Sequence, residues 1–239
     1  MSLVSLSETF RDEEKNSDVR TAKWYIIAAS ALAAAGGGPA VVDLYQLAIK
    51  GVTLDEEKTI QRRIKEAILK TSILYGVPKS LQALLPLFSI LPDDRIDHTG
   101  PRCESLHSKE AAILREQKGR EYFDTIWGLE AAQFHRDRNF KYQPDLYLLN
   151  LKFVYEWYLS EDTILSSTET QMCNAAALIC SGNPVQALWH TRGILRHGGG
   201  IEQARLSQYI GLEIARLYDC KIGDIVRADD IEVDVKSPE

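Results

Sequence analysis

Apolar positions in this chain recur three and four residues apart, which is the spacing of an amphipathic helix. The clearest run follows Thr53, which forms the signature of a capping box with Glu56 three residues later. Gly76 and Pro78 predict the end of this helix. The positions expected on its buried face are Ile60, Ile64, Ala67, Ile68, Thr71 and Tyr75.

The same periodicity predicts helices through most of the remaining chain, and no run alternates as a half-buried strand would. Residues 145–159 carry so many large apolar side chains that we expect a core or interface helix there. The helix expected over 80–89 should turn inward Leu81, Leu84, Leu85 and Phe88. Further helices are expected over 108–136, with candidate breaks at Gly119 and Gly128, and over 163–181, 184–197 and 202–219.

Residues 25–42 form an uncharged stretch that resembles a membrane span only superficially. A spanning helix needs about 20 strongly apolar residues, whereas this stretch is rich in Ala and Gly. Gly36-Gly37-Gly38-Pro39 interrupts it, and the acidic, mixed residues 1–18 do not resemble the basic start of a signal peptide. We therefore expect neither membrane insertion nor secretion.

Two segments of the chain share a pattern at an offset of 147 residues. Residues 21–58 and 168–205 each contain a helix of small residues, a Gly-containing turn, a second amphipathic helix and a terminal glycine, Gly51 or Gly198. The pattern predicts an internally duplicated bundle built from two helical hairpins. The chain then divides into an N-terminal segment (1–19), a first repeat (20–92), a linker (93–103), a second repeat (104–226) and a C-terminal tail (227–239).

Composition narrows the classes of partner. The 239 residues are 45% hydrophobic and 26% charged, enough to build a core without disulfide or metal cross-links. The net charge is −6 and no basic stripe is present, so we expect no nucleic-acid partner.

The four cysteines lack CxxC spacing, which fits a reducing compartment. Because residues 236–239 also differ from an SKL-type peroxisomal signal, we expect a cytoplasmic protein.

The segment HTRGILRHG, which runs from His190 to Gly198, resembles part of the carboxymuconolactone decarboxylase and alkylhydroperoxidase D-like superfamily. The first copy resembles the same unit through VVDLYQLAIKGVTLDEE and KEAILKTSILYGVPKSLQALLPL. GREYFDTIWG and LNLKFVYEWYLSEDTILSSTETQ look like the first half of the decarboxylase-type module, so the resemblance covers most of residues 20–220. It implies an all-α, alkylhydroperoxidase D-like bundle that assembles as a homo-oligomer.

The peroxidase branch of that superfamily uses a Glu, two cysteines at CxxC spacing and a His. In this chain the His position is His190, the cysteine positions are Asn183 and Gln186, and the Glu position is Gln171. Thiol peroxidase chemistry needs an attacking thiolate and a nearby resolving thiol, so we do not expect it in this chain. Cys180 lies three residues before the first of these cysteine positions and has no partner in reach by sequence. The corresponding positions of the first copy hold Trp24, Gly36, Pro39 and Asp43.

The resemblance therefore favours a cofactor-independent lyase or decarboxylase that acts on a small carbonyl-bearing acid or lactone. His190 would be the proton donor or acceptor, because an imidazole titrates near neutral pH. Gln171, Asn183 and Gln186 would bind the substrate through their amides. The alternative is a catalytically inactive protein that keeps the fold for binding or assembly, since the Glu and both Cys positions are replaced.

Each of these residues also has a purely structural interpretation. His190 would then be a hydrogen-bonded core histidine, and Gln171 a buried amide with internal partners. Asn183 would cap the following helix, with Pro184 in its first turn. We expect no metal site, because His98, Cys103 and His107 lack an evident fourth ligand. The role of the first copy, with Asp43 in the His place, stays open.

Overall fold

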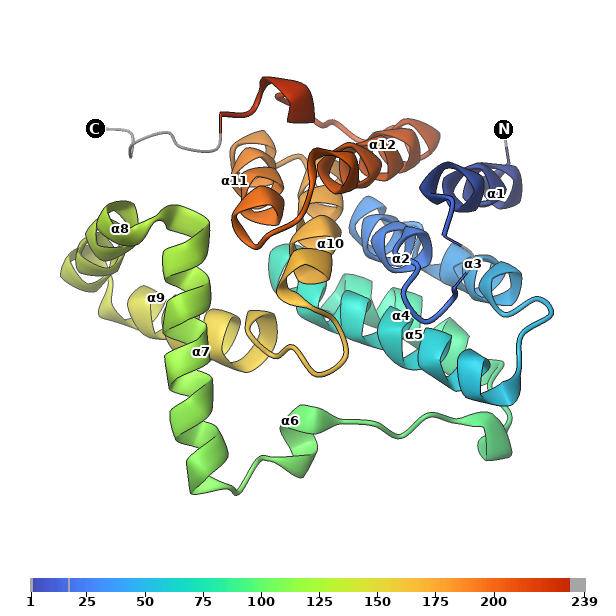
Figure 1. Cartoon of the computed structure of the whole chain (residues 1–239), viewed down its shortest axis with the longest axis horizontal. Coiled ribbons are helices and arrows are strands. Elements are labelled where there is room, and N and C mark those ends of the chain that lie inside the picture. Colours follow the sequence, from blue (N-terminus) through green and yellow to red (C-terminus); the bar gives the residue numbers. More distant parts are fainter. Residues whose placement is uncertain (1, 17, 233–239) are drawn as a thin grey trace.

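The computed structural model describes residues 2–16 and 18–232 and is all helical in this part of the chain (Figure 1). It contains twelve α-helices, several short 3-10 segments and one π-helix, and the described residues form no strand. The all-α fold class predicted from the sequence is confirmed. None of the described helices has the length and apolar character needed to cross a bilayer.

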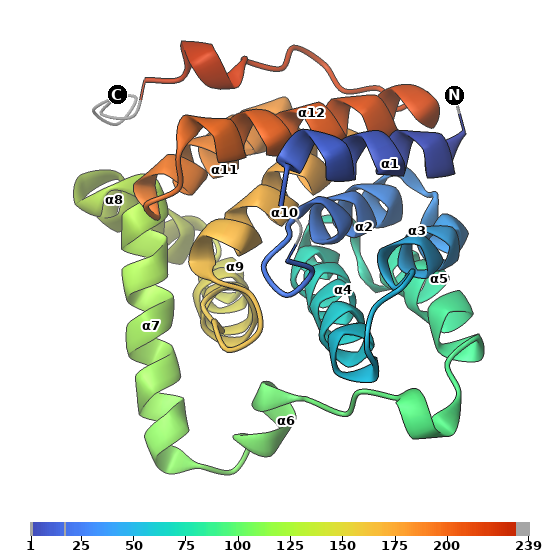
Figure 2. The same ribbon diagram turned by 45° about the vertical axis from the view of Figure 1, so that its right-hand side comes forward.

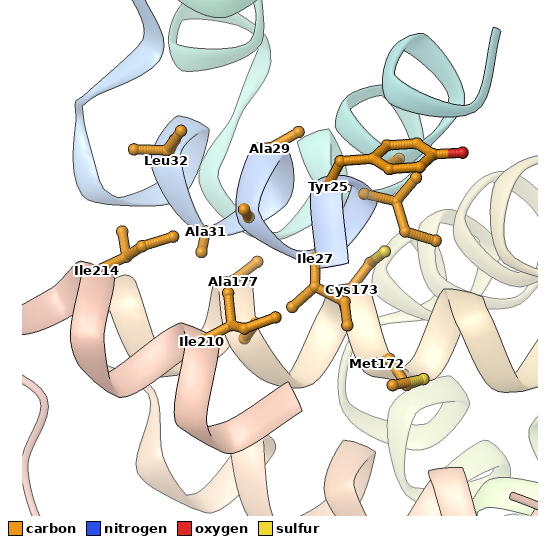
Figure 3. Close-up of a cluster of buried hydrophobic side chains, with 14 of the residues drawn as sticks. Tyr25, Ile27, Ala29, Ala31, Leu32, Met172, Cys173, Ala177, Ile210 and Ile214 are labelled. Carbon is orange, nitrogen blue, oxygen red and sulfur yellow. The ribbon is translucent and has the colours of Figure 1, made fainter. Parts of the chain in front are cut away.

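Two helices of small residues form the centre of the molecule. Helix α2 (Trp24–Ala35) is buried from Trp24 to Ala34, and helix α10 (Ser167–Cys180) is buried from Thr170 to Cys180. Their alanines allow the two backbones to pack closely, and both helices share one continuous hydrophobic core (Figure 3). Side chains of α12 (Ile201–Leu217), among them Ile210 and Ile214, complete this core.

The other helices of the bundle surround this pair. Helix α1 (Leu3–Glu14) lies beside α12 (Figure 2). The carboxylate of Glu14 accepts hydrogen bonds from the backbone at the start of α2, at 2.8 Å from Lys23 N and 2.9 Å from Trp24 N. The remaining helices are α3 (Val41–Ala48), α4 (Leu54–Tyr75), α5 (Val77–Ser89) and α11 (Pro184–Arg196). The capping box predicted at the start of α4 is confirmed: the amide of Thr53 donates to the Glu56 carboxylate at 2.9 Å.

The predicted inward face of α5 is wrong except at Leu84, which is partly buried and packs against the core. Leu81, Leu85 and Phe88 are exposed, and the buried positions are Ser80, Ala83 and Leu87. Pro78 lies in the first turn of α5, so this helix begins earlier than expected. The short segment η1 (Gly38–Ala40) packs against α5 so closely that a Cβ on Gly38 would lie 2.8 Å from the Ala83 amide nitrogen. That approach requires a small residue at position 83, whereas Leu81, Leu85 and Phe88 point outward.

Residues 101–159 form an arm beside the bundle (Figures 1 and 2). Helix α7 (Lys109–Trp127) runs through Gly119 without a break, and the chain turns at Gly128, whose φ is 78°. The segment expected to be one core helix over 145–159 is divided between a short α-helix and the π-helix. The other elements of the arm are α6 (Pro101–Glu104), α8 (Leu129–Tyr142), α9 (Pro144–Leu148) and η3 (Leu149–Leu159).

The arm has its own small core, and buried charges connect it to the bundle. Tyr122, Phe123 and Tyr155 belong to that core. Lys70 of α4 is fully buried, and its ammonium donates to the carbonyl of Leu159 at 3.2 Å, to Thr170 Oγ1 at 2.8 Å and to the carbonyl of Glu161. Burial lowers the pKa of Lys70 to about 8, so all three donors remain available at neutral pH.

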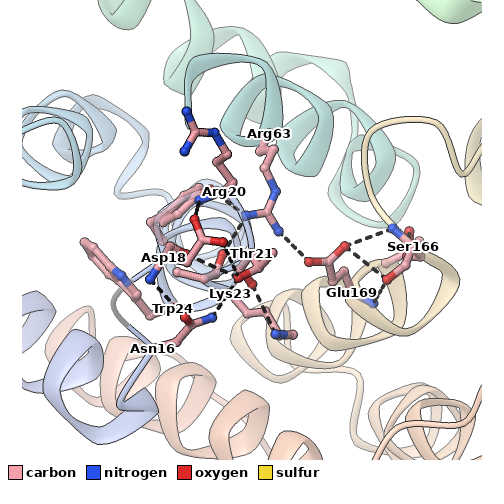
Figure 4. Close-up of polar contacts among 12 residues, drawn as sticks. Asn16, Asp18, Arg20, Thr21, Lys23, Trp24, Arg63, Ser166 and Glu169 are labelled. Carbon is pink, nitrogen blue, oxygen red and sulfur yellow. Dashed lines mark hydrogen bonds and ion pairs between the residues drawn. The ribbon is translucent and has the colours of Figure 1, made fainter. Parts of the chain in front are cut away.

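A second buried cation connects three helices of the bundle (Figure 4). The Arg63 guanidinium of α4 donates to the Ala22 carbonyl at 2.7 Å and to Tyr25 Oη at 2.6 Å, and it forms an ion pair with Glu169. Glu169 also accepts from the Ser166 amide at 2.9 Å in a second capping box, which begins α10. Arg63 therefore holds the starts of α2 and α10 against the middle of α4.

Several features recur near the offset seen in the sequence. Helix α4 begins at Leu54 and α12 at Ile201, 147 residues later. Gln61 donates to the Arg95 carbonyl at 3.2 Å and accepts from the Asp97 amide at 2.6 Å. Gln208, again 147 residues later, donates to the Val226 carbonyl at 2.7 Å and accepts from the Ala228 amide at 2.8 Å. Both glutamines thus bind a following extended segment by the same pair of bonds.

The segments at the two ends of the chain pack on this bundle as far as they are described. The N-terminal segment contains α1, whose Phe10 lies edge-on to Tyr209 of α12 with ring centroids 5.6 Å apart. The C-terminal tail contains the short segment η4 (Ala228–Asp230). Residues 233–239, including the four examined for a targeting signal, lie outside the described residues.

Candidate functional site

Helix α11 carries the candidate catalytic histidine. The helix starts at Pro184, and Ala187, Thr191 and Ile194 turn inward with His190, which is only 6% exposed. His190 therefore lies on the face that α11 packs against α10 rather than on a free surface. This burial agrees with the structural interpretation of the residue and does not by itself decide between the two roles.

A hydrogen-bonded chain joins His190 to the arm. The Gln171 amide of α10 donates through Nε2 to Tyr122 Oη at 2.8 Å, and its Oε1 lies 2.8 Å from Nδ1 of His190. Because an amide oxygen only accepts, the imidazole must donate from Nδ1. The arrangement holds the ring as the Nδ1–H tautomer, and Nε2 then carries the lone pair. Within the described part of the chain, Nε2 of His190 has no hydrogen-bond partner.

Gly193 makes this chain of contacts possible. It lies one turn after His190, and a Cβ at this position would be 2.6 Å from Gln171 Oε1. Any larger residue would displace the amide from the imidazole. The glycine therefore allows α11 to approach α10 closely enough for the Gln171–His190 bond.

Burial sets the protonation state of the site. It lowers the pKa of His190 to about 4, and the neighbouring His197 adds a smaller effect in the same direction. Burial likewise lowers the pKa of His197 to about 4 and raises the pKa of the Tyr122 hydroxyl. At neutral pH the site therefore contains two neutral imidazoles and a neutral phenol.

Two polar atoms beside this chain are buried without a partner among the described residues. They are Oδ1 of Asn174 and Nε2 of His197. The other atom of the Asn174 amide, Nδ2, lies 3.5 Å from His190 Nδ1, and the His197 ring stacks on Tyr122 with centroids 4.5 Å apart. An unpaired buried polar atom costs about 1–3 kcal/mol, so their clustering around one histidine calls for an explanation other than stability.

The structure does not bring Asn183 and Gln186 into this cluster. Asn183 donates from Nδ2 to the carbonyl and the hydroxyl of Ser181, both at 3.0 Å, and Gln186 is exposed. Asn183 does precede α11, with Pro184 in the first turn, but its side chain does not bond to the helix amides. Of the four residues proposed from the sequence, His190 and Gln171 are in contact.

Sequence reasoning missed Tyr122 and Asn174. Asn174 lies three residues after Gln171, the spacing that places two residues on one helix face, so that signal was available. Tyr122 is 49 positions from Gln171, and only the packing of the arm brings it near.

The corresponding region of the first copy has no such chain. Trp24, in the Gln171 place, is buried edge-on to Tyr25 with ring centroids 5.6 Å apart. Asp43, in the His190 place, is exposed on α3. The nearby Tyr45 hydroxyl donates instead to the Glu57 carboxylate at 3.1 Å.

No known family model matches the chain, and no solved structure shows significant similarity to it. Two curated proteins do. "Peroxisomal protein 2" of Schizosaccharomyces pombe is 28% identical over 170 residues, which cover 70% of this chain and 76% of that protein. "Peroxisomal protein 2" of Saccharomyces cerevisiae is 27% identical over 161 residues, which cover 59% of this chain and 56% of that protein. The chain is thus similar to two yeast proteins named for the peroxisome.

Proposed function

We propose that this chain is a cofactor-independent lyase or decarboxylase for a small carbonyl-bearing acid or lactone, with His190 as its proton-transfer residue. One observation carries the proposal. Gln171 fixes the neutral imidazole as the Nδ1–H tautomer, and this leaves the unpartnered Nε2 as a base. Nε2 is not one of the fully buried atoms that lack a partner, so it can be reached by water or by a small ligand.

The proposed fold is an alkylhydroperoxidase D-like bundle with two internally repeated hairpins. Two observations support the duplication. Helices α4 and α12 begin at the same offset as the sequence pattern, and Gln61 and Gln208 make equivalent hydrogen bonds. Gly51 and Gly198 add to this support, since both follow a short helix and both adopt a left-handed conformation, with φ values of 79° and 85°.

The chemistry follows from the protonation state. The neutral imidazole first accepts the carboxylic acid proton of the substrate at Nε2. The C–C bond then breaks, CO2 leaves, the electron pair of that bond forms an enolate, and the imidazolium returns the proton to the carbon that lost CO2. The low pKa of His190 favours this return, because burial disfavours the charged ring. Asn174 would be the substrate-positioning group, since its unpartnered Oδ1 can accept a hydrogen bond from a substrate hydroxyl.

The test is a screen of small β-keto acids and lactones for CO2 release or ring opening, with the wild-type protein and His190→Gln. We expect the variant to lose turnover by about 10²–10⁴-fold, the usual contribution of a general acid–base residue. His135→Gln is the matched control, because His135 lies on α8, stacked on Trp127 at 4.5 Å and outside the chain of hydrogen bonds. Unchanged turnover in His190→Gln would contradict the proposal.

A second candidate function is binding or assembly without catalysis. Its supporting observation is a group of exposed apolar side chains on α8, α9 and η3, which suits a contact with a second copy of this chain. Sedimentation analysis would test it, with Phe140→Glu expected to dissociate the oligomer. The exposed side chains are Leu129, Phe134, Phe140, Tyr142, Leu146, Leu148, Leu149 and Phe153.

We also propose the peroxisome, rather than the cytoplasm, as the site of action. The support is the name shared by the two yeast relatives. Imaging of the tagged full chain beside a peroxisomal marker would test it, and a diffuse signal would favour the cytoplasm.

A further inference from the structure

Two cysteines that are 40 positions apart in the sequence lie side by side in the structure. Cys180 is the last residue of α10, and Cys220 follows the end of α12. The two thiols lie close enough to shift each other's pKa in opposite directions. Neither position corresponds to the CxxC cysteines of the peroxidase branch, so this pair is separate from the His190 site.

The backbone explains how Cys220 reaches Cys180. Asp219 adopts a left-handed conformation, with φ of 52°, and the Cys220 amide donates to the Ala215 carbonyl at 2.8 Å. This turn reverses the chain at the end of α12. The chain then passes over the turn after α10, where a Cβ on Gly182 would lie 2.6 Å from the Lys221 carbonyl oxygen. The two cysteines are therefore held together by closely packed backbone.

The two thiols differ in a way that assigns them different roles. Cys180 is buried and donates to the Gly211 carbonyl at 3.3 Å, whereas Cys220 is partly exposed. The Cys180 thiol and, to a smaller extent, the Lys79 ammonium lower the pKa of Cys220 to about 7, against the effects of burial and of Asp219. The neighbouring Cys220 thiol and burial raise the pKa of Cys180. Cys220 is thus the accessible thiolate, and Cys180 the protected thiol.

We propose that Cys180 and Cys220 form a peroxide-sensitive pair that a hydroperoxide converts to a disulfide. The Cys220 thiolate attacks the peroxide, so that an S–O bond forms, the O–O bond breaks, and hydroxide leaves to become water. The Cys180 sulfur, as it loses its proton, then attacks the Cys220 sulfur and displaces a second water. Two thiols are oxidised by two electrons, and hydrogen peroxide is reduced to two molecules of water.

The other two cysteines provide internal controls. Cys103 is exposed on α6. Cys173 is buried in the middle of α10, and burial raises its pKa to about 12, so it should not react. The proposal therefore predicts a specific order of reactivity, in which Cys220 precedes Cys103 and Cys173 stays reduced.

The test treats the reduced full chain with increasing hydrogen peroxide, alkylates the remaining thiols and maps the peptides by mass spectrometry. We expect a Cys180–Cys220 disulfide to form while Cys103 is still alkylated. Without peroxide, we expect iodoacetamide at pH 7 to label Cys220 at least about fivefold faster than Cys103. Equal oxidation of Cys220 and Cys103, or a disulfide to another cysteine, would overturn the proposal.

Two variants separate the roles. Cys180→Ser should leave Cys220 as a sulfenic acid that dimedone traps, and Cys220→Ser should leave Cys180 reduced. Cys103→Ser is the matched control and should still form the disulfide. Circular dichroism checks that each variant is folded, and a wild-type protein whose Cys220 stays fully alkylatable after peroxide would refute the proposal without any variant.

Discussion

The two central helices are equally buried, but they differ in what they bury. Helix α2 presents alanines, isoleucines and a single serine, Ser30, between its neighbours. Helix α10 buries Thr170, Gln171 and Asn174 along with its alanines. Buried polar groups are costly unless they are bonded, and one of these, Asn174, keeps an unpaired atom. The difference indicates that α2 is built for packing and that α10 also carries a polar site.

The largest expected loss of stability comes from replacing Lys70 of α4, the buried cation that donates to both α10 and the arm. Lys70→Met would leave the Leu159 and Glu161 carbonyls and the Thr170 hydroxyl without their donor. Each buried polar group left without its partner costs about 1–3 kcal/mol. Urea unfolding should show this loss, whereas Lys118→Met, which removes an exposed pair with Asp162, should cost under about 1 kcal/mol. Similar losses in the two variants would contradict the assignment of a polar core around α10.

Acid should destabilise the protein through the two histidines. Their pKa values of about 4 lie below the unfolded value near 6.5, so the unfolded chain takes up protons first. Stability is then complete above about pH 6.5 and falls as the pH drops toward 4. Each histidine should account for about 2 kcal/mol between pH 6.5 and 5, at about 1.4 kcal/mol per pKa unit. In His190→Gln the pH slope should be roughly halved, and an unchanged slope would show that His190 is not buried as a neutral ring.

Loss of the hydrogen bonds of Gln171 should lower the free energy of unfolding by an intermediate amount. Gln171→Leu leaves His190 Nδ1 and Tyr122 Oη without their partner, which should cost about 2 kcal/mol. Trp24→Leu changes the corresponding position of α2 and tests the loss of packing alone. If Gln171→Leu were neutral, water would have to replace the amide, and the histidine would not be fixed by it.

The smallest expected change in the free energy of unfolding is for a substitution at Asn174. Because its Oδ1 has no partner among the described residues, Asn174→Leu should change the unfolding free energy by less than about 1 kcal/mol, or increase it. The same variant should impair any turnover that depends on His190. A large loss of stability would instead make Asn174 a structural residue and would weaken the proposed site.

Local signals in the sequence were sufficient for the all-α class and for several helix boundaries. The capping box at Thr53 and the glycine at position 128 act within a few residues, and both predict observed helix boundaries. The inward face of α5 was wrong at Leu81, Leu85 and Phe88 because the close approach of Gly38, a residue distant in the sequence, places Ala83 on the inner face. Long-range packing of this kind leaves no periodic signal.

The candidate site was predictable only in part, for the same reason. Gln171 and His190 were identified through the family resemblance, and they are in contact. Asn183 and Gln186 were predicted from the same resemblance, but neither lies in the site. Asn183 donates to Ser181, and Gln186 is exposed to solvent. Tyr122 and the neighbouring thiols of Cys180 and Cys220 depend on segments that meet only in the folded chain.

The protonation state of His190 is the central claim, and long-range ¹H–¹⁵N NMR of the imidazole across pH 4–8 tests it most directly. We expect an Nδ1–H signal with Nε2 unprotonated at neutral pH, and no titration until the pH falls below about 5. An Nε2–H tautomer, or a titration near pH 6.5, would contradict the account of His190 as a buried base held by Gln171.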